Sequence, residues 1–432
     1  MFVLPLILAA TSLLIWIALT FFRGAFWRLG AFDDDQSVHP APQKWPAVVA
    51  VVPARNEAVT IERAIASLAG QSYKGRFQII VVDDHSEDCT AALAEQAAQS
   101  GGGSVLVTVH SVGRLEGGWT GKLWALEQGV AEARTQAPDY FWFTDADIVH
   151  GPDTLERLVS RAESGRLDLV SLMVLLEARS RAERILIPPF LYFFLKLYPP
   201  RWIANPKSQV AGAAGGCLLL RRTALEGIGG LAAVRSEVID DCALARAVKR
   251  SGRAIWMGLT RRSVSLRSYK TFGELRELIA RTAFTQLRYS APLLLGTLVA
   301  MLATYVLPVV FSVTGRAVVW RTSLAAWLLM TLTYVPTVRF YGLSPLWAPA
   351  LPVAAIFYSY ATWLSAWRYW LGRGGQWKGR AQAPTKAAPG AGSRCLRRQG
   401  RPGGYSASES VSGGARTPTI IKTGDGNHFL IY

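Results

Sequence analysis

The chain has 432 residues with 50% hydrophobic content and a formal net charge of +17 at pH 7, and its positive mean hydropathy exceeds what a soluble domain needs, which indicates membrane segments. Its four cysteines show no CxxC spacing, so they indicate neither a zinc site nor a disulfide framework, in keeping with a reducing cytosol. The basic residues form no aromatic-interleaved patch, and we therefore expect no nucleic-acid partner.

The N-terminal segment predicts a membrane anchor. Its first 22 residues carry no charge, and at about 1.5 Å per residue a helix of this length reaches roughly 30 Å, the thickness of a bilayer core. A cleaved signal peptide is the alternative, but the segment lacks a basic start and its apolar run is longer than such peptides usually have. Because Arg23 and Arg28 follow the run, we expect residues 1–28 to form a retained anchor whose C-terminal end is cytoplasmic.

Residues 45–290 show the pattern of an α/β domain. Short apolar runs alternate with amphipathic stretches, and the strands that we expect, with their polar ends, are Ala47–Glu57, Phe77–Asp88, Ser104–His110 and Asp139–Asp147. Nearly continuous apolar strands that alternate with helices are typical of a mostly parallel sheet covered on both faces. In that architecture ligands bind at the carboxyl ends of the strands. Three of the expected strands end in a polar cluster, so we expect a site at this edge.

One of these clusters is an acidic pair separated by one residue, Asp145 and Asp147. Strand alternation would place both carboxylates on the same side, and their oxygens suit Mg²⁺ or Mn²⁺, which takes its remaining ligands from water and substrate phosphates. The alternative is helix capping, because Asp147 and Asp153 lie just before and within the first turn of an expected helix. The neighbouring clusters favour the metal site.

The other two clusters suit a nucleotide. The carboxylates of Asp83 and Asp84 could accept from the N–H of a pyrimidine base or from ribose hydroxyls, with helix capping as the ordinary alternative. The cluster from Pro53 to Glu57 contains no GxGxxG fingerprint, which argues against a nicotinamide cofactor. The chain also lacks a GxxxxGK[ST] loop, so P-loop ATP hydrolysis is not expected.

Further apolar segments occupy the rest of the chain. Residues 185–202 are interrupted by Pro188 and Pro189 and are short for a span, so we expect them to embed at the membrane surface, with a buried core helix as the alternative. About three C-terminal membrane segments are expected within residues 291–371, near 291–313, 318–337 and 346–367.

The tail, residues 373–432, carries ten Lys or Arg against two Asp or Glu in a sequence rich in Gly, Pro, Ala and Ser. We expect it to be disordered and attracted to anionic lipids. Three C-terminal spans would put this tail outside the cell, whereas its basic residues argue for the cytoplasm. Either one segment is re-entrant or the count of spans is wrong, and the sequence leaves both alternatives open.

Six motifs occur in the order, and at roughly the spacing, of a known family: PARNE, VVDDHSEDCT, GGWTGKLWAL, FTDAD, GGCLLLRRTALEGIGG and IDDCALARAVKRSG. They resemble the motifs of family 2 glycosyltransferases with the GT-A fold over about residues 47–290. With apolar segments at both ends, the set is most similar to the hopene-associated glycosyltransferases of bacteria and more distantly to ceramide glucosyltransferase. The resemblance implies an α/β GT-A domain that binds a nucleotide-sugar, with transmembrane helices at both ends.

The resemblance implies a role for each matched residue. The donor would contact Pro53, Ala54, Arg55, Glu57, Asp83, Asp84, Lys122 and Asp145. Asp84, with Asp83 beside it, would bind the base, Lys122 would neutralise the diphosphate, and Asp145 and Asp147 would hold ribose and metal. Asp241 matches the general base, and the neighbouring Asp240 replaces the glutamate of the commonest pattern. Capping of the following helix is the alternative for this last pair.

A second departure from the family pattern is Gln286-Leu287-Arg288-Tyr289. Processive members carry Gln-x-x-Arg-Trp, and this chain is one residue short and has Tyr in place of Trp. We interpret the segment as an acceptor or interfacial contact. The difference argues against polymer synthesis.

Together these assignments imply an inverting transfer of one sugar from a nucleotide-diphosphate donor, with UDP favoured, to the hydroxyl of a membrane lipid related to hopanoids. A divalent metal, Mg²⁺ or Mn²⁺, would assist. The implied location is the bacterial inner membrane, with several membrane passes and the catalytic domain facing the cytoplasm. Two alternatives stay open: a nucleotidyltransferase on the same type of sheet, and a non-catalytic membrane scaffold.

Overall fold

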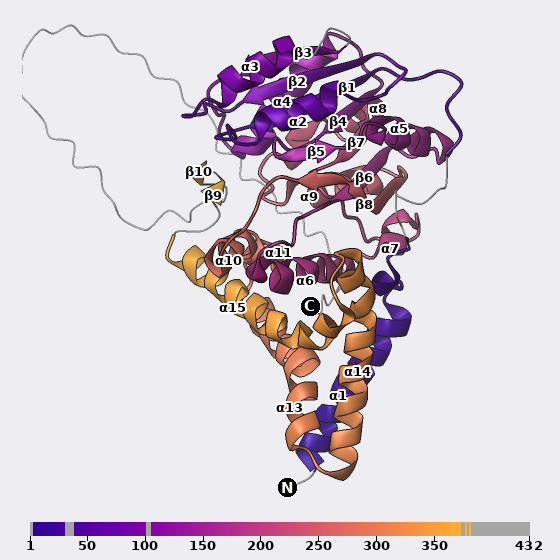
Figure 1. The fold of residues 1–432 in the computed structure, drawn as a ribbon, viewed down its shortest axis with the longest axis vertical. Coiled ribbons are helices and arrows are strands. Elements are labelled where there is room, and N and C mark those ends of the chain that lie inside the picture. The colour runs from indigo at the N-terminus through magenta and orange to yellow at the C-terminus, as the bar shows by residue number, and fades with distance from the viewer. Residues whose placement is uncertain (1–2, 31–38, 101–104, 373–375, 378–379, 382–432) are drawn as a thin grey trace, which may run out of the picture.

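The structure is a computed structural model that describes residues 3–30, 39–100, 105–372, 376–377 and 380–381. Three regions follow one another along the long axis in Figure 1: an α/β domain, a middle layer of helices and a stalk of long helices. The stalk contains helices from both ends of the described chain. The α/β domain is therefore an insertion between two parts of the stalk.

An eight-stranded sheet forms the centre of the α/β domain. Its strands are β1 (Val48–Ala54), β2 (Phe77–Asp83), β3 (Leu106–Ser111), β4 (Tyr140–Phe143), β5 (Ile148–His150), β6 (Leu169–Leu175), β7 (Leu218–Arg221) and β8 (Ile255–Ser265). They lie in the order β3-β2-β1-β4-β7-β6-β8-β5. The first four pair in parallel, as do β6 and β8, whereas β7 is antiparallel to both neighbours and β5 is antiparallel to β8. The sheet is thus mostly parallel, as the sequence predicts.

Helices cover both faces of this sheet. They are α2 (Ile61–Ala69), α3 (Thr90–Ser100), α4 (Gly121–Arg134), α5 (Thr154–Ser164), α8 (Arg222–Gly227) and α9 (Asp240–Arg250), with the short 3₁₀ turn η2 (Leu231–Val234). Every residue of β1 is buried. Val49 and Val51 pack in the core that contains α4, and Ala50 and Val52 pack in the core that contains α2. Because both sets of alternate side chains are buried, the strand is apolar throughout.

The middle layer lies between the sheet and the stalk (Figure 1) and contains α6 (Arg181–Leu197), α7 (Pro200–Ala204), α10 (Phe272–Ala280) and α11 (Ala283–Gln286). A capping box begins α6: Ser180 Oγ accepts from the Glu183 N–H, and the Glu183 carboxylate accepts from the Ser180 N–H. The helix continues through Pro188 and Pro189, where the sequence indicates an interruption, and most of its side chains are buried. This segment is therefore a packed helix up to Leu197.

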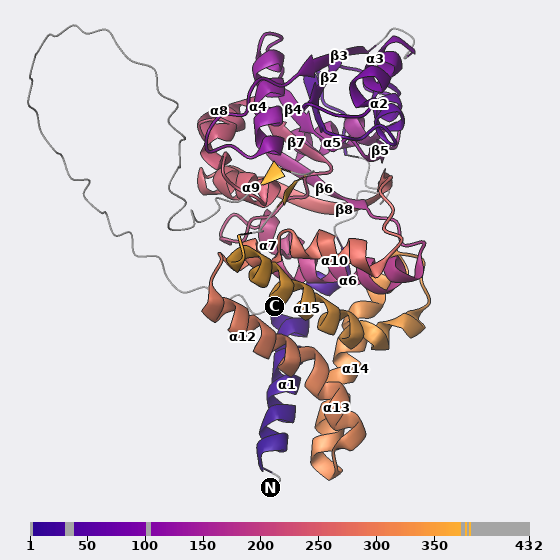
Figure 2. The ribbon, with the colours of Figure 1, turned by 90° about the vertical axis from the view of Figure 1, so that its left-hand side faces the viewer.

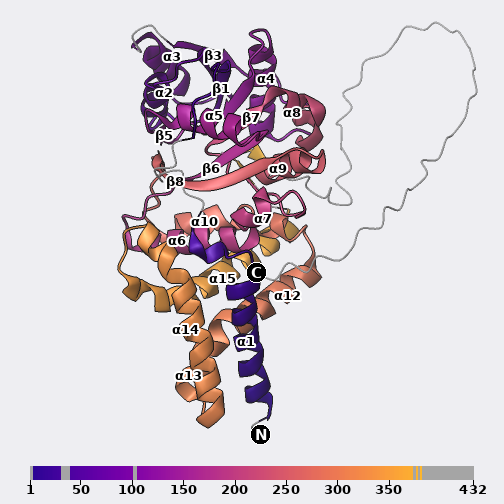
Figure 3. The same cartoon turned by 90° about the vertical axis from the view of Figure 1, so that its right-hand side faces the viewer.

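The stalk consists of α1 (Val3–Phe22), α14 (Ala317–Phe340) and a helical stretch made of α12 (Ala291–Met301), the π-helical turn η3 (Leu302–Val306) and α13 (Leu307–Thr314). Figure 3 shows α1 beside α13 and α14. Side chains of α1 also donate to carbonyl groups at the π-helical turn, where the regular hydrogen-bond pattern is interrupted. Ser12 Oγ lies 2.6 Å from Ala303 O, and Trp16 Nε1 lies 2.8 Å from Thr304 O. Helices that precede and follow the α/β domain in the sequence thus form one packed unit.

Among the described residues, three helical stretches are long and apolar enough to cross a bilayer: Val3–Phe22, Ala291–Thr314 and Ala317–Phe340. The third apolar segment expected after residue 291 forms the 3₁₀ turn η4 (Pro345–Ala350) and α15 (Leu351–Trp370) instead. Figures 1 and 2 show that α15 runs across the direction of α1 and α14. Two C-terminal stretches, rather than the expected three, therefore have the length and composition of a span.

Two small features complete the described chain. The 3₁₀ turn η1 (Phe26–Arg28) follows α1, and the Phe26 ring packs edge-on against Tyr192 of α6 with the ring centroids 5.2 Å apart. The short strands β9 (Gln376–Trp377) and β10 (Arg380–Ala381) pair antiparallel. The rest of the basic tail expected over residues 373–432 lies outside the described residues.

Candidate active site

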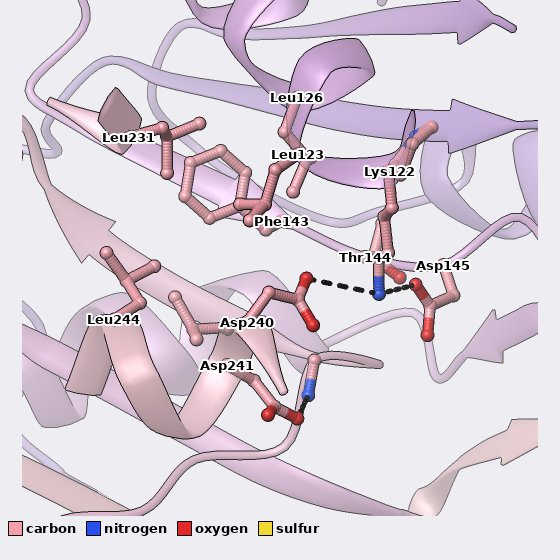
Figure 4. Close-up of a pocket in the computed structure, with 13 residues that line it drawn as sticks. Lys122, Leu123, Leu126, Phe143, Thr144, Asp145, Leu231, Asp240, Asp241 and Leu244 are labelled. Atoms are coloured by element: carbon pink, nitrogen blue, oxygen red, sulfur yellow. Dashed lines mark hydrogen bonds and ion pairs between the residues drawn. The ribbon is translucent and has the colours of Figure 1, made fainter. Parts of the chain in front are cut away.

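An open pocket lies at the carboxyl ends of β1 and β4. It is lined by Pro53, Lys122, Leu123, Leu126, Phe143, Thr144, Asp145, Gly215, Leu218, Leu231, Asp240, Asp241 and Leu244. Figure 4 shows the charged side chains grouped on one side and the leucines with Phe143 on the other. The pocket therefore brings together the start of α4, the end of β4 and the start of α9, three segments that are far apart in the sequence.

Lys122 connects two of these segments. Its ammonium nitrogen lies 2.7 Å from Asp145 Oδ1 and 3.7 Å from Asp240 Oδ2, and Figure 4 shows it between the two carboxylates. Burial alone would lower the pKa of Lys122, but the charges of Asp145 and Asp240 outweigh burial and raise it. For Asp145, burial opposes ionisation, but Lys122 holds its pKa below the ordinary value. Lys122 is therefore a permanent cation that ties the end of β4 to the start of α9.

Asp241 is the second residue of α9 and faces the loop before β7. Its Oδ2 accepts from the Gly215 N–H at 2.9 Å, and its Oδ1 accepts from the Cys242 N–H at 2.7 Å. Burial and then repulsion from Asp240 raise the pKa of Asp241 to about 6. Asp240 and Asp241 are the first two residues of α9, whose N-cap residue is Ile239, so neither is the cap of this helix. At pH 7 this carboxylate is ionised and more basic than an ordinary aspartate.

Gly215 keeps the space between the charged groups open. A Cβ atom on this residue would lie 3.3 Å from Lys122 Nζ and 3.5 Å from Asp241 Oδ2. Its N–H also holds the Asp241 carboxylate. The glycine is thus part of the site through both its backbone and its lack of a side chain.

The two aspartates of the Asp-x-Asp motif lie in a turn. β4 ends at Phe143, and the Ile148 N–H bonds to Asp145 O before β5 begins. The expectation that strand alternation positions both carboxylates is therefore wrong, because the chain leaves the sheet before it reaches them. The motif owes its geometry to the contacts that fix this turn.

A buried histidine fixes one end of the turn. His150 Nε2 lies 2.8 Å from Thr144 Oγ1, and His150 Nδ1 lies 2.9 Å from Ser263 Oγ. Thr144 Oγ1 in turn donates to Gly216 O at 3.0 Å. Burial lowers the pKa of His150 to about 3, so the ring is neutral at physiological pH. β5, β8 and the loop before β7 thereby hold the residue next to Asp145.

Asp147 contacts side chains at the end of β8 and just beyond it. Its Oδ2 lies 3.3 Å from both Ser265 Oγ and Arg267 Nε, and a terminal nitrogen of Arg267 lies 2.8 Å from Glu57 Oε1. Burial, and then the charge of Asp145, raise the pKa of Asp147 to about 6. The capping alternative does not apply to Asp147, because α5 begins only at Thr154. Arg267 thus joins the predicted first loop to the Asp-x-Asp turn.

A divalent cation fits the pair formed by Asp145 and Asp147. Burial is the main cause of the raised pKa of Asp147, and the second cause, the charge of Asp145, is one that a bound cation would offset. The described part of the chain holds no group of three or more His, Cys, Asp or Glu placed around one metal position. The remaining ligands would then be water and substrate phosphates, which is the usual arrangement for Mg²⁺. The chemistry of the donor set agrees with Mg²⁺ or Mn²⁺.

Arg55 organises the loop next to the pocket. Its side chain is buried, donates to the carbonyl oxygens of Asp84 and His85, and lies 3.9 Å from the Asp84 carboxylate. The Asp84 N–H bonds to the carbonyl of Ala54, the last residue of β1. Arg55 and Asp84 therefore stabilise each other and the neighbouring strand ends, while Pro53, one residue before Ala54, reaches the pocket wall.

Asp83 has a different environment from its neighbour. Its Oδ2 accepts from the Ser86 N–H at 3.2 Å, whereas its Oδ1 is buried and has no hydrogen-bond partner among the described residues. A buried acceptor of this kind is unusual unless a ligand or water supplies the donor. The Oδ1 of Asp83 is therefore an acceptor that a donor from a ligand or water would satisfy.

Sequence reasoning missed four residues of this site: Gly215, His150, Ser265 and Arg267. Two of them depend on β8, which was not predicted because two exposed arginines interrupt its pattern of buried residues. Ser265 ends that strand, and Arg267 follows two residues later. A basic residue just beyond a strand is the signal that could have pointed to Arg267.

The segment Gln286 to Tyr289 lies outside the pocket lining. Gln286 Nε2 donates to Tyr198 Oη at 2.6 Å, and the Tyr289 ring stacks on Tyr369 of α15 with centroids 4.4 Å apart. Arg288 and Tyr289 both have positive backbone φ angles, 52° and 57°, which residues other than glycine rarely adopt. The segment is thus a tight turn at the junction of the middle layer with α15.

The fold and this site define a class of protein. The mostly parallel sheet, the polar first loop, the Asp-x-Asp turn and the acidic start of α9 form a GT-A α/β fold. Residues 49–229 match the family described as Glycosyl transferase family 2. This stretch is therefore similar to family 2 glycosyltransferases, and the helix that carries Asp240 and Asp241 begins after the matched residues, beyond η2.

Similar proteins include an N-acetylglucosaminyltransferase of Mesorhizobium japonicum, which is 26% identical over 190 residues, or 43% of this chain and 42% of that protein. The match therefore spans less than half the length of this relative. A solved mannosyltransferase from Pyrobaculum calidifontis in complex with GDP-Man and Mn²⁺ is 17% identical with a TM-score of 0.49, and the match covers 81% of this chain and 99% of that chain. A solved glucosyl-3-phosphoglycerate synthase from Mycobacterium tuberculosis in complex with Mn²⁺ and UDP is 23% identical with a TM-score of 0.36. That match covers 56% of this chain and 80% of that chain.

Proposed function

We propose that this protein is a membrane-bound inverting glycosyltransferase that moves a single sugar from a nucleotide-diphosphate donor to the hydroxyl of a lipid. The observation that carries the proposal is the position of Asp241. Its carboxylate lines the same pocket as Lys122, Asp145 and Asp240 and is held by two backbone N–H groups. A fixed base beside groups suited to a diphosphate and a cation is what a direct displacement requires.

In this mechanism Asp241 removes the proton from the acceptor hydroxyl. The hydroxyl oxygen forms a bond to the anomeric carbon while the bond from that carbon to the diphosphate oxygen breaks. The proton stays on Asp241, the sugar leaves on the acceptor with inverted configuration, and the nucleoside diphosphate is released. The Gly215 and Cys242 N–H groups orient the carboxylate. A general base typically contributes about 10²- to 10⁴-fold to the rate.

The donor would lie against the other charged groups of the pocket. Lys122 would balance charge on the diphosphate, and Asp145 and Asp147 would hold a divalent cation, which when bound stabilises negative charge on the departing group. The buried Oδ1 of Asp83 would accept from an N–H of the base. Uracil N3–H is one donor of this kind, and a UDP-sugar is the donor that we propose.

A lipid acceptor is supported by the apolar surface next to the α/β domain. Along α15 the residues Val353, Ile356, Tyr360, Trp363, Trp367 and Trp370 are 42–60% exposed. Their spacing of three or four residues places them on one helix face. Exposed tryptophans and tyrosines are typical of the boundary between lipid headgroups and acyl chains. A bilayer surface at α15 would place lipid hydroxyl groups next to the middle layer, which adjoins the α/β domain in Figure 1.

The proposed membrane is the bacterial inner membrane, with the α/β domain on the cytoplasmic side. Arg23 and Arg28 follow α1 and favour that orientation. The motif set is most similar to that of hopene-associated glycosyltransferases, so hopanoid alcohols are the first acceptors to examine. A catalytically silent scaffold would have no use for the ionised, pocket-facing Asp241, and the first loop lacks the glycines of a nucleotidyltransferase phosphate loop.

The substitution Asp241→Asn tests the base. It preserves the shape of the side chain but removes its ability to accept a proton, so transfer should fall by at least about 100-fold. Binding of UDP in the presence of Mn²⁺ should stay close to that of the wild type, as measured by isothermal titration on the detergent-solubilised chain. Near-normal sugar transfer by Asp241→Asn would show that the base has been misassigned.

A further inference from the structure

Arg267 lies beside the Asp-x-Asp turn, although nothing in the sequence motifs assigns it a role there. It follows β8, and its guanidinium bridges two acidic groups from different parts of the chain: Nε lies 3.3 Å from Asp147 Oδ2, and a terminal nitrogen lies 2.8 Å from Glu57 Oε1. The side chain is one-third exposed. It is therefore anchored at the edge of the site but still accessible to a ligand.

The charges of the site form two separate bridges. Lys122 links Asp145 to Asp240, and Arg267 links Asp147 to Glu57. The Arg267 bridge occupies an oxygen of the carboxylate that, in the proposed function, holds the divalent cation. A guanidinium and a divalent cation on one carboxylate repel each other, since both carry positive charge. The two are thus competitors for Asp147.

We infer that Arg267 is a further donor-binding residue that exchanges partners: it pairs with Asp147 in the donor-free site, leaves Asp147 when that carboxylate takes a divalent cation, and then binds the donor diphosphate while Glu57 keeps its anchor. This inference rests on the proposed function. Arginine suits this role because its planar group carries five N–H donors, which allows it to hold a carboxylate and a phosphate oxygen at once.

The exchange predicts opposite effects on two affinities in Arg267→Gln. Because the variant lacks the guanidinium that competes with the metal for Asp147, it should bind Mn²⁺ alone more tightly, by roughly 3- to 10-fold. Without the diphosphate contact, it should bind UDP at saturating Mn²⁺ more weakly, by roughly 10- to 100-fold. Free Mn²⁺ is measured by electron paramagnetic resonance and UDP binding by isothermal titration, both on the full chain in detergent.

Two further variants make the result specific. Arg262→Gln removes an arginine of β8 itself, whose partner is Asp153 at the surface with 3.0 Å between nitrogen and oxygen, and it should leave both affinities unchanged. Arg267→Lys keeps the charge but loses the fork geometry, so its Mn²⁺ affinity should stay close to that of the wild type and its UDP affinity should fall less than in the glutamine variant.

The outcomes separate this inference from the proposed function. If both affinities fall together in Arg267→Gln, the arginine only supports the fold of the site, and the exchange is wrong. Unchanged Mn²⁺ affinity or unchanged UDP affinity in this variant overturns it as well. If the wild type binds no UDP with Mn²⁺, the proposed donor is wrong too. Tighter Mn²⁺ and weaker UDP binding, with Arg262→Gln unaffected, supports the exchange.

Discussion

Asp147 and Asp241 share a feature that separates them from the other acidic residues of the site. Burial raises the pKa of each to about 6, and in each case the next cause is a neighbouring aspartate, Asp145 or Asp240. Acidic pairs with raised pKa values are typical of functional sites, because their charge is balanced fully only when a ligand binds. The contacts support different tasks: Asp147 pairs with a cationic side chain, whereas Asp241 is held by backbone N–H groups.

The pKa of Asp241 predicts the pH dependence of transfer. The base acts as the carboxylate, and its pKa is about 6, so kcat/KM should be level above that pH and fall as the pH decreases through it. At pH 5 the ionised fraction, and with it the rate, should be roughly tenfold lower than the plateau. The profile is measured from pH 4.5 to 8.5 at saturating Mn²⁺.

Asp240→Asn supplies the matched control for this profile. Since repulsion from Asp240 contributes to the raised pKa of Asp241, its removal should move the acid limb to lower pH. A limb that stays in place, or that moves to higher pH, would contradict the coupling of the two carboxylates.

At the scale of the elements, the sequence predicts those strands best whose residues are nearly all buried. β1, β2 and β4 are apolar because both faces are covered, and polar clusters follow at their ends, with the candidate pocket at the ends of β1 and β4. β5 has only three residues, and β8 exposes Arg261 and Arg262 in its middle, so neither gives a continuous apolar run. Without β8 the sequence could not place Ser265 or Arg267. The turn that carries Asp145 likewise depends on the distant His150 contacts, which local patterns do not encode.

The packing of α4, which carries Lys122, gives a prediction at this scale. A Cβ atom on Gly129 would lie 2.4 Å from a methyl carbon of Val51 and 2.8 Å from one of Val82. Gly129→Ala should therefore push α4 away from β1 and β2 and lower the stability by about 1–3 kcal/mol. The thermal unfolding midpoint of the full chain in detergent measures this change.

Gly273→Ala is the control for the packing argument. This glycine also lies in a helix, α10, but the nearest heavy atom to its added Cβ is 3.7 Å away. The substitution should be neutral or raise the stability by up to about 1 kcal/mol. Equal effects of the two alanines would show that helix propensity, and not contact with the sheet, determines the cost at Gly129.

At the scale of the whole molecule, the number of spans determines where the tail lies. With α1, the stretch from Ala291 to Thr314 and α14 as the candidate spans, the chain would cross the membrane twice after the α/β domain. The end of α15 would then lie on the same side as that domain, as the basic residues after Trp370 also favour. The conflict between three C-terminal spans and a basic cytoplasmic tail is removed if α15 lies along the membrane surface.

Reporter fusions test this topology. A green fluorescent protein fused after Gly372, at the end of α15, should fluoresce because it stays in the cytoplasm. An alkaline phosphatase fused after Gly315, between α13 and α14, should be active because it is exported. A dark fusion at Gly372 together with an active phosphatase at the same position would show that α15 crosses the membrane.

The most direct test of the proposed function is mass spectrometry of lipids after reaction. The full chain is reconstituted into vesicles of bacterial membrane lipids that include hopanoid alcohols and is incubated with Mn²⁺ and a panel of UDP-sugars. We predict that one lipid class gains the mass of a single sugar with the wild type and gains none with Asp241→Asn. If every lipid keeps its mass with the wild type while the donor is consumed, or if products carry many sugars, single transfer to a lipid is wrong.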